Sequence, residues 1–121
     1  MTQDYDPLDF LGQERTTADN AEEERRQRQK EISDLCRVMG IKEGRRFMWR
    51  LLSDAGVYHS TFSNDALQMA FNEGQRNTGL KHMSDMMSVC PQQYALMLDE
   101  QRKERETDEQ RSTDRRNKSR R

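Results

Sequence analysis

Large apolar side chains are scarce in this 121-residue sequence, where hydrophobic residues make up 31% and charged residues 36%. Ordinary globular domains carry about 45–50% apolar and about 25% charged residues. No run approaches the roughly 20 apolar residues that span a bilayer, and the acidic N-terminus lacks the regions of a signal peptide. We therefore expect at most one small folded domain and no membrane partner.

Cysteine and histidine are also few. Cys36 and Cys90 stand far apart and match no metal-ligand spacing. Both have apolar neighbours, which favours two buried free thiols in a reducing compartment. The two histidines, His59 and His82, form no two-histidine helical pair. We therefore expect no bound metal.

Recognisable catalytic patterns are missing as well. Residues 74–81 resemble a phosphate-binding loop, but Leu80 separates the glycine from the lysine and His82 replaces the required hydroxyl. A serine or cysteine nucleophile needs a base within hydrogen-bond reach, and the sequence indicates no such set. It predicts a non-enzymatic protein that uses no cofactor.

The apolar residues that are present lie mostly in the middle of the chain and recur at helical spacing. They predict an all-α fold, a small three- to four-helix unit at residues 19–100. An extended acidic N-terminal arm at 1–18 precedes it, and a polar, partly disordered C-terminal extension at 101–121 follows. Gly56 and Pro91 are expected to end the second helix and to begin the fourth. The predicted buried stripe of the second helix is Phe47, Met48, Leu51, Leu52 and Ala55.

The two ends of the chain carry opposite charge. Residues 1–20 hold five acids and one base, whereas residues 111–121 hold six bases and one acid. Such asymmetry is typical of solvated tails that keep a core soluble, and also of head-to-tail association or of separate partners for the two ends.

Two segments are candidate protein-binding surfaces. In the arm, acids alternate with bulky apolar groups, which suits a short docking peptide or a segment folded onto its own core. The sequence also holds 8 methionines, whose flexible side chains suit an interface that repacks against another chain. The residues predicted to bind protein are Tyr5, Leu8, Phe10, Leu11, Met83, Met86 and Met87.

A nucleic-acid interface is the alternative. It requires clustered bases for phosphate contacts and an exposed ring for stacking, and Trp49 lies among three arginines. The same three arginines have acidic residues near them in the sequence. This favours the alternative that they form ion pairs inside the helical unit. The candidate nucleic-acid residues are Arg45, Arg46, Arg50, Arg115, Arg116, Lys118, Arg120 and Arg121.

Three motifs resemble a known family. They are G-R-R-F-x-W-R-L-L-x-x-A-G-V-Y (44–58), F-N-E-G-Q-R-N-x-G-L (71–80) and P-x-x-Y-x-x-M-L-x-E (91–100). Over about residues 33–100 the chain resembles a small domain family of tailed bacteriophages, known from short-tailed phages and encoded among virion-morphogenesis genes. The resemblance implies a virion or virion-assembly protein.

Within that context we expect a structural or assembly protein that binds portal, internal core or capsid proteins and forms a homo-oligomer. It would be located in the virion, after assembly in the host cytoplasm. The alternative is a DNA-binding packaging or DNA-delivery (ejection) factor.

The motif residues also have a structural interpretation. Glycines allow the second and third helices to cross closely. Glu73 is then expected to reach Arg46 or Arg50, and such a buried pair fixes register more than it adds stability. The residues assigned to this structural motif are Gly44, Arg46, Trp49, Arg50, Glu73, Gly74, Arg76, Asn77 and Gly79.

Overall fold

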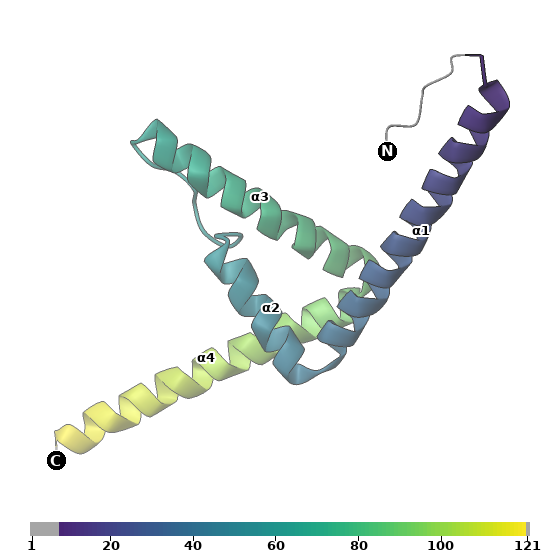
Figure 1. Ribbon diagram of the computed structural model, residues 1–121. Helices are drawn as coiled ribbons and strands as arrows, with labels where there is room; N and C mark the ends of the chain where they lie inside the picture. Colours follow the sequence, from purple (N-terminus) through teal and green to yellow (C-terminus); the bar gives the residue numbers. More distant parts are fainter. Residues whose placement is uncertain (1–7, 121) are drawn as a thin grey trace. The chain divides into compact units, whose positions relative to one another are not determined.

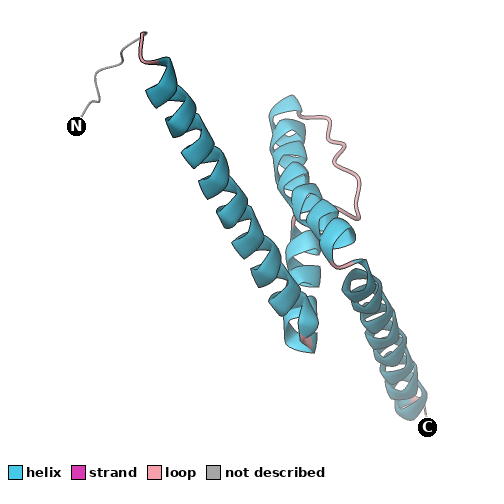
Figure 2. Cartoon of the chain, turned by 90° about the vertical axis from the view of Figure 1, so that its right-hand side faces the viewer, coloured by secondary structure: helices cyan, strands magenta, loops and turns pink. Residues whose placement is uncertain are grey.

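A computed structural model describes residues 8–120 of the chain. These residues form helices joined by short connections and include no strand, which confirms the predicted all-α fold (Figure 1; Figure 2). The helices are α1 (Phe10–Gly40), α2 (Lys42–Asp54), α3 (Ala66–Val89) and α4 (Pro91–Ser119). None of them is long and apolar enough to cross a membrane.

The chain divides into two compact units, residues 1–34 and residues 35–121. Within 1–34, the described residues contain one element, the first part of α1. Within 35–121, α2, α3 and α4 pack against one another in all three pairings. The final residues of α1 belong to this second unit.

The start of α1 differs from the prediction. The Oδ1 atom of Asp9 accepts a hydrogen bond from the backbone N–H of Gly12 at 2.9 Å. A carboxylate in this place satisfies a donor that the first helical turn leaves unpaired, so the helix begins at Phe10. Of the arm predicted as extended at 1–18, residues 10–18 are therefore helical, and residues 1–7 lie outside the described part.

The last helix also extends beyond expectation, through most of the segment predicted to be partly disordered. No glycine or proline follows its first residue, and side-chain pairs one turn apart line it. Arg102 Nη2, for example, lies 2.7 Å from Asp99 Oδ1, and this hydrogen bond lowers the pKa of the Asp99 carboxyl. Arg116 and Lys118 occupy the last turn, where the helix dipole favours cations.

The boundaries predicted at Gly56 and Pro91 are confirmed. Gly56 follows α2 with a φ of +80°, a left-handed conformation that glycine adopts without strain. Pro91 is the first residue of α4. The cap of α3 is Asp65, whose carboxylate accepts from the backbone N–H of Leu67 at 3.0 Å.

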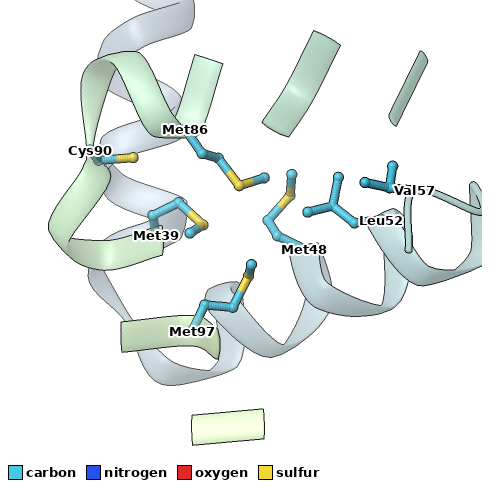
Figure 3. Close-up of a cluster of buried hydrophobic side chains, with 7 residues drawn as sticks. All are labelled: Met39, Met48, Leu52, Val57, Met86, Cys90 and Met97. Atoms are coloured by element: carbon cyan, nitrogen blue, oxygen red, sulfur yellow. The ribbon is translucent and has the colours of Figure 1, made fainter. Parts of the chain in front are cut away.

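The core of the second unit is small and rich in sulfur. Side chains from the end of α1 and from α2, α3 and α4 converge there (Figure 3). Methionine fills irregular gaps with little strain, which suits helices that bring few matched side chains together. The buried apolar residues are Met39, Met48, Leu52, Val57, Met86, Cys90 and Met97.

Two burial predictions were wrong. Cys36 is exposed and only Cys90 is buried, where loss of hydration raises the pKa of its thiol. Phe47, placed in the buried stripe of α2, is 53% exposed, although Met48 and Leu52 of that stripe are buried. The core covers only the part of the apolar stripe of α2 that carries Met48 and Leu52. Phe47 lies at the edge of this stripe, outside the part that the other helices cover.

Candidate interaction surface

The arginines of α2 form structural contacts. Arg45 is 8% exposed, and its Nη2 atom lies 2.7 Å from Oε1 of Glu100 on α4. Its Nε atom donates to the same carboxylate at 3.0 Å, and Nη1 donates to the carbonyl of Met39 at 3.0 Å. Arg45 is therefore committed to a buried pair and is not available to a phosphate.

The neighbouring arginines are exposed but occupied. Arg46 Nε lies 3.9 Å from Oε1 of Glu104. The guanidinium of Arg50 lies over the ring of Phe47, 5.7 Å from the ring centroid. The predicted pairing of Glu73 with Arg46 or Arg50 was wrong, because the Glu73 carboxylate instead accepts a hydrogen bond from the Thr61 hydroxyl.

The motif glycines differ in their surroundings. A Cβ on Gly79 would stand 2.5 Å from Cγ2 of Val57 and 2.8 Å from Cβ of Ala55, so α3 closely approaches the end of α2 there. Gly44 instead approaches the backbone carbonyl of Val38 at the end of α1, and Gly74 faces open space. The expected close crossing of the second and third helices therefore depends on Gly79 alone.

Trp49 is half-buried and stacks on Tyr58, with ring centroids 4.9 Å apart and an interplanar angle of 25°. The hydroxyls of Tyr58 and Tyr94 lie 3.1 Å apart. Burial, reinforced by this hydrogen bond, raises the pKa of Tyr58. The Trp49 ring already has an intramolecular stacking partner, which weakens its candidacy for stacking on a nucleic-acid base.

The remaining motif residues lie on α3. Arg76 is partly buried, and its Nε atom is buried without a hydrogen-bond partner among the described residues. Asn77 is exposed. The described part of the chain shows no group of His, Cys, Asp or Glu side chains placed to hold a metal.

The residues predicted to bind protein fall into three classes. Leu8, Phe10 and Leu11 are exposed, the last two in the first turn of α1. Met86 is fully buried in the core and Met83 packs against that core, so the predicted methionine-rich surface was wrong for both. Met87 is exposed, whereas Tyr5 lies outside the described residues.

A different apolar surface lies around the first half of α3. Phe62, in the preceding loop, is 76% exposed, and Leu67 and Phe71 are 83% and 60% exposed. The last two are four residues apart and hence on the same side of the helix. We call Phe62, Leu67 and Phe71 the α3 apolar surface.

The loop before α3 is tied to the helix by side-chain hydrogen bonds. The Thr61 hydroxyl donates to Glu73, and the Thr61 carbonyl accepts from Asn72 Nδ2 at 3.5 Å. These contacts hold Thr61, the residue before Phe62, against the second turn of α3. The polar motif residue Glu73 thus fixes the loop segment that carries Phe62.

The basic residues at the end of α4 are exposed on the helix. Asp114, the acid among them, accepts a hydrogen bond from Gln110 at 3.2 Å. Arg121 lies outside the described residues. The exposed basic residues are Arg111, Arg115, Arg116, Lys118 and Arg120.

Two features of the site were not predicted from the sequence. Glu100 lies three residues after the buried Met97 and thus on the same side of α4, a spacing that signals an inward-facing carboxylate. Nothing in the sequence indicated that Phe62 and Leu67 would be exposed, because helical spacing does not distinguish an exposed apolar residue from a buried one.

The fold and its surfaces define a small all-helical domain with a methionine-lined core and an uncovered apolar surface. Residues 35–99 match the family described as Bbp19-like phage protein, which covers more than half of the chain. The chain belongs to this family and is a phage-associated protein, which confirms the resemblance seen in its motifs. Comparison with curated proteins and with solved structures gives no match.

Proposed function

We propose that this protein is a non-enzymatic structural or assembly component of the phage particle. It binds another virion protein, such as the portal, internal core or capsid protein, through the α3 apolar surface. The observation that carries the proposal is the exposure of Phe62, Leu67 and Phe71 on one ordered part of the fold. The match of residues 35–99 to a phage protein family supports a role in the phage.

Burial energetics support this use of the surface. Covering a Leu or Phe side chain that was exposed to water contributes about 1.5–3 kcal/mol. Protein interfaces derive most of their affinity from a few such buried anchors, surrounded by contacts that matter little. The hydrogen bonds of Thr61 hold the loop backbone that leads to Phe62 in place before binding, which reduces the entropy lost when a partner docks.

The test is incorporation into particles. The phage would carry Leu67→Ser together with Phe71→Ser, and the chain would be quantified by mass spectrometry in purified particles and assembly intermediates. Incorporation should fall at least about tenfold, which corresponds to about 1.4 kcal/mol of lost binding. Asn77→Ser, at an exposed position on another side of α3, is the matched control and should leave incorporation unchanged.

Circular dichroism of the purified variants must show unchanged helix content, so that a loss reflects binding. The proposal fails if the wild-type chain is absent from both particles and assembly intermediates. It also fails if the double variant is incorporated as well as the Asn77→Ser control.

DNA binding in packaging or delivery is the second candidate, and the exposed bases at the end of α4 favour it. The affinity of a protein for duplex DNA falls as the salt concentration rises. On a plot of log affinity against log salt concentration, each phosphate contact adds about −0.9 to the slope. Replacing Arg115, Arg116, Lys118 and Arg120 with Gln should therefore weaken binding and flatten this slope. Binding that is absent even at low salt would exclude this function.

A further inference from the structure

The first part of α1 is an exposed helix without a buried side. From residue 8 to residue 34 every side chain is exposed or partly exposed. The unit formed by residues 1–34 has no second described element to pack against. Helices owe most of their stability in proteins to packing, so this segment would gain from a partner.

Charge divides this segment into two blocks. Residues 14–24, the acidic block, hold five acids and one base, and residues 25–30, the basic block, hold four bases and no acid. Contacts within the helix use some of these groups, for example Arg26 Nη2 with Glu22 Oε1 at 3.1 Å. That pair is exposed on both sides, and exposed pairs of this kind contribute little.

One stripe of the helix suits close approach of another helix. Its positions recur every three and four residues, the period at which two helices stay in contact along their length. After Glu14, small side chains occupy it in the acidic block, and arginines with long apolar stems occupy it in the basic block. The positions are Leu11, Glu14, Ala18, Ala21, Arg25, Arg28 and Ile32.

We propose that α1 pairs antiparallel with α1 of a second copy of this chain, the two helices crossing at the boundary of the two blocks, between Glu24 and Arg25. The basic block of each copy then lies along the acidic block of the other, and arginine stems cover the alanines. A parallel pair would place acids against acids and bases against bases. The antiparallel pair is a two-fold symmetric contact in which both copies use the same surface. This pairing goes beyond the proposed function and uses a different unit.

The test uses charge reversal in the full-length chain. One variant carries Glu22→Lys, Glu23→Lys and Glu24→Lys, and a second carries Arg25→Glu, Arg26→Glu and Arg28→Glu. Each makes its two blocks alike in sign, so its dimer dissociation constant should rise at least about tenfold. A third variant with all six changes again has two blocks of opposite charge. Its dimer dissociation constant should return to within about threefold of the wild-type value.

Light scattering after size exclusion, over a range of concentrations, measures the dimer, and circular dichroism checks that each variant stays helical. A monomeric wild-type chain at the highest concentration would overturn the proposal. So would a six-change variant that dimerises as poorly as the two three-change variants. The Leu67→Ser, Phe71→Ser chain should remain dimeric, which separates this pairing from binding through the α3 apolar surface.

Direction is measured with spin labels on Gln13→Cys in a Cys36→Ser background. Because a helix rises 1.5 Å per residue, an antiparallel pair crossing between Glu24 and Arg25 separates the two labelled positions by roughly 35 Å. A parallel pair would place them roughly 10 Å apart. The shorter distance would overturn the antiparallel arrangement.

Discussion

Arg45 and Glu100 join α2 to α4 through a buried ion pair that spans 55 positions of sequence. Both nitrogens Nε and Nη2 donate to one carboxylate, and the third, Nη1, satisfies a backbone carbonyl at the end of α1. Three helices of the second unit therefore meet at one side chain. This arrangement determines how they register against one another.

Removing one partner of this pair should be costly. Glu100→Ala leaves the Arg45 charge largely buried without its counterion, and breaking such pairs costs about 3–5 kcal/mol. Part of the Glu100 side chain reaches solvent, and solvent screens the charge of this pair. We therefore expect Glu100→Ala to lower the free energy of unfolding by about 2–3 kcal/mol. Urea denaturation measures the loss.

The control for that experiment is Arg46→Ala, which removes an exposed pair with Glu104 and should cost less than about 1 kcal/mol. The double change Arg45→Met, Glu100→Leu removes both charges and should recover much of the lost stability. Equal costs for Glu100→Ala and Arg46→Ala would show that the pair does not hold the helices together.

Gly79→Ala should destabilise the fold, because the added Cβ would stand 2.5 Å from Val57 Cγ2 and 2.8 Å from Ala55 Cβ. Overpacking of this kind costs about 1–3 kcal/mol. Gly74→Ala in the same helix meets open space and should instead stabilise by up to about 1 kcal/mol. Thermal unfolding measures the melting temperature of both variants against the wild type. Changes in melting temperature of the same sign would contradict the close approach at Gly79.

Adjacent methionines should respond very differently to truncation. Met86 is fully buried, so Met86→Ala should cost about 2–5 kcal/mol of unfolding free energy. Met87 is 53% exposed, so Met87→Ala should change stability by no more than about 0.5 kcal/mol. Chemical denaturation tests both, and a near-neutral Met86→Ala would return Met86 to the candidate binding residues.

The two thiols should differ in reactivity. Cys36 is exposed, whereas burial shields Cys90 and raises the pKa of its thiol, which lowers the fraction present as reactive thiolate. At neutral pH, iodoacetamide should therefore alkylate Cys36 first, as peptide mass spectrometry will show. In denaturant the two rates should converge. Faster labelling of Cys90 in the folded protein would place that residue outside the core.

Local features were predictable because they depend on residues close in sequence. The turn at Gly56 and the start of α4 at Pro91 each follow from one residue with restricted or unusual backbone geometry. The start of α1 was missed because an aspartate suited to capping stands at Asp9 and again at Asp19, where the helical unit was predicted to begin. The choice between them is not visible in the helical spacing.

The functional surface was harder to predict, since burial is decided by which neighbours cover a side chain. Met86 and Met87 are adjacent residues of one type, yet one is in the core and the other is exposed. Arg45 and Arg46 differ in the same way. The pairing of Arg45 with Glu100 required knowledge of which helices meet, and the sequence alone predicted a different pair, Glu73 with Arg46 or Arg50.

The sequence by itself determined the all-α fold, the boundaries in the middle of the chain and the phage family, because helical spacing, turn residues and motifs are properties of short segments. Only the tertiary structure decided that the methionines form the core, that Arg45 is buried and that Phe62, Leu67 and Phe71 are uncovered. The physical reason is the small number of helices in the second unit. They cover one side of each other, and the apolar residues on the remaining sides stay exposed to a partner.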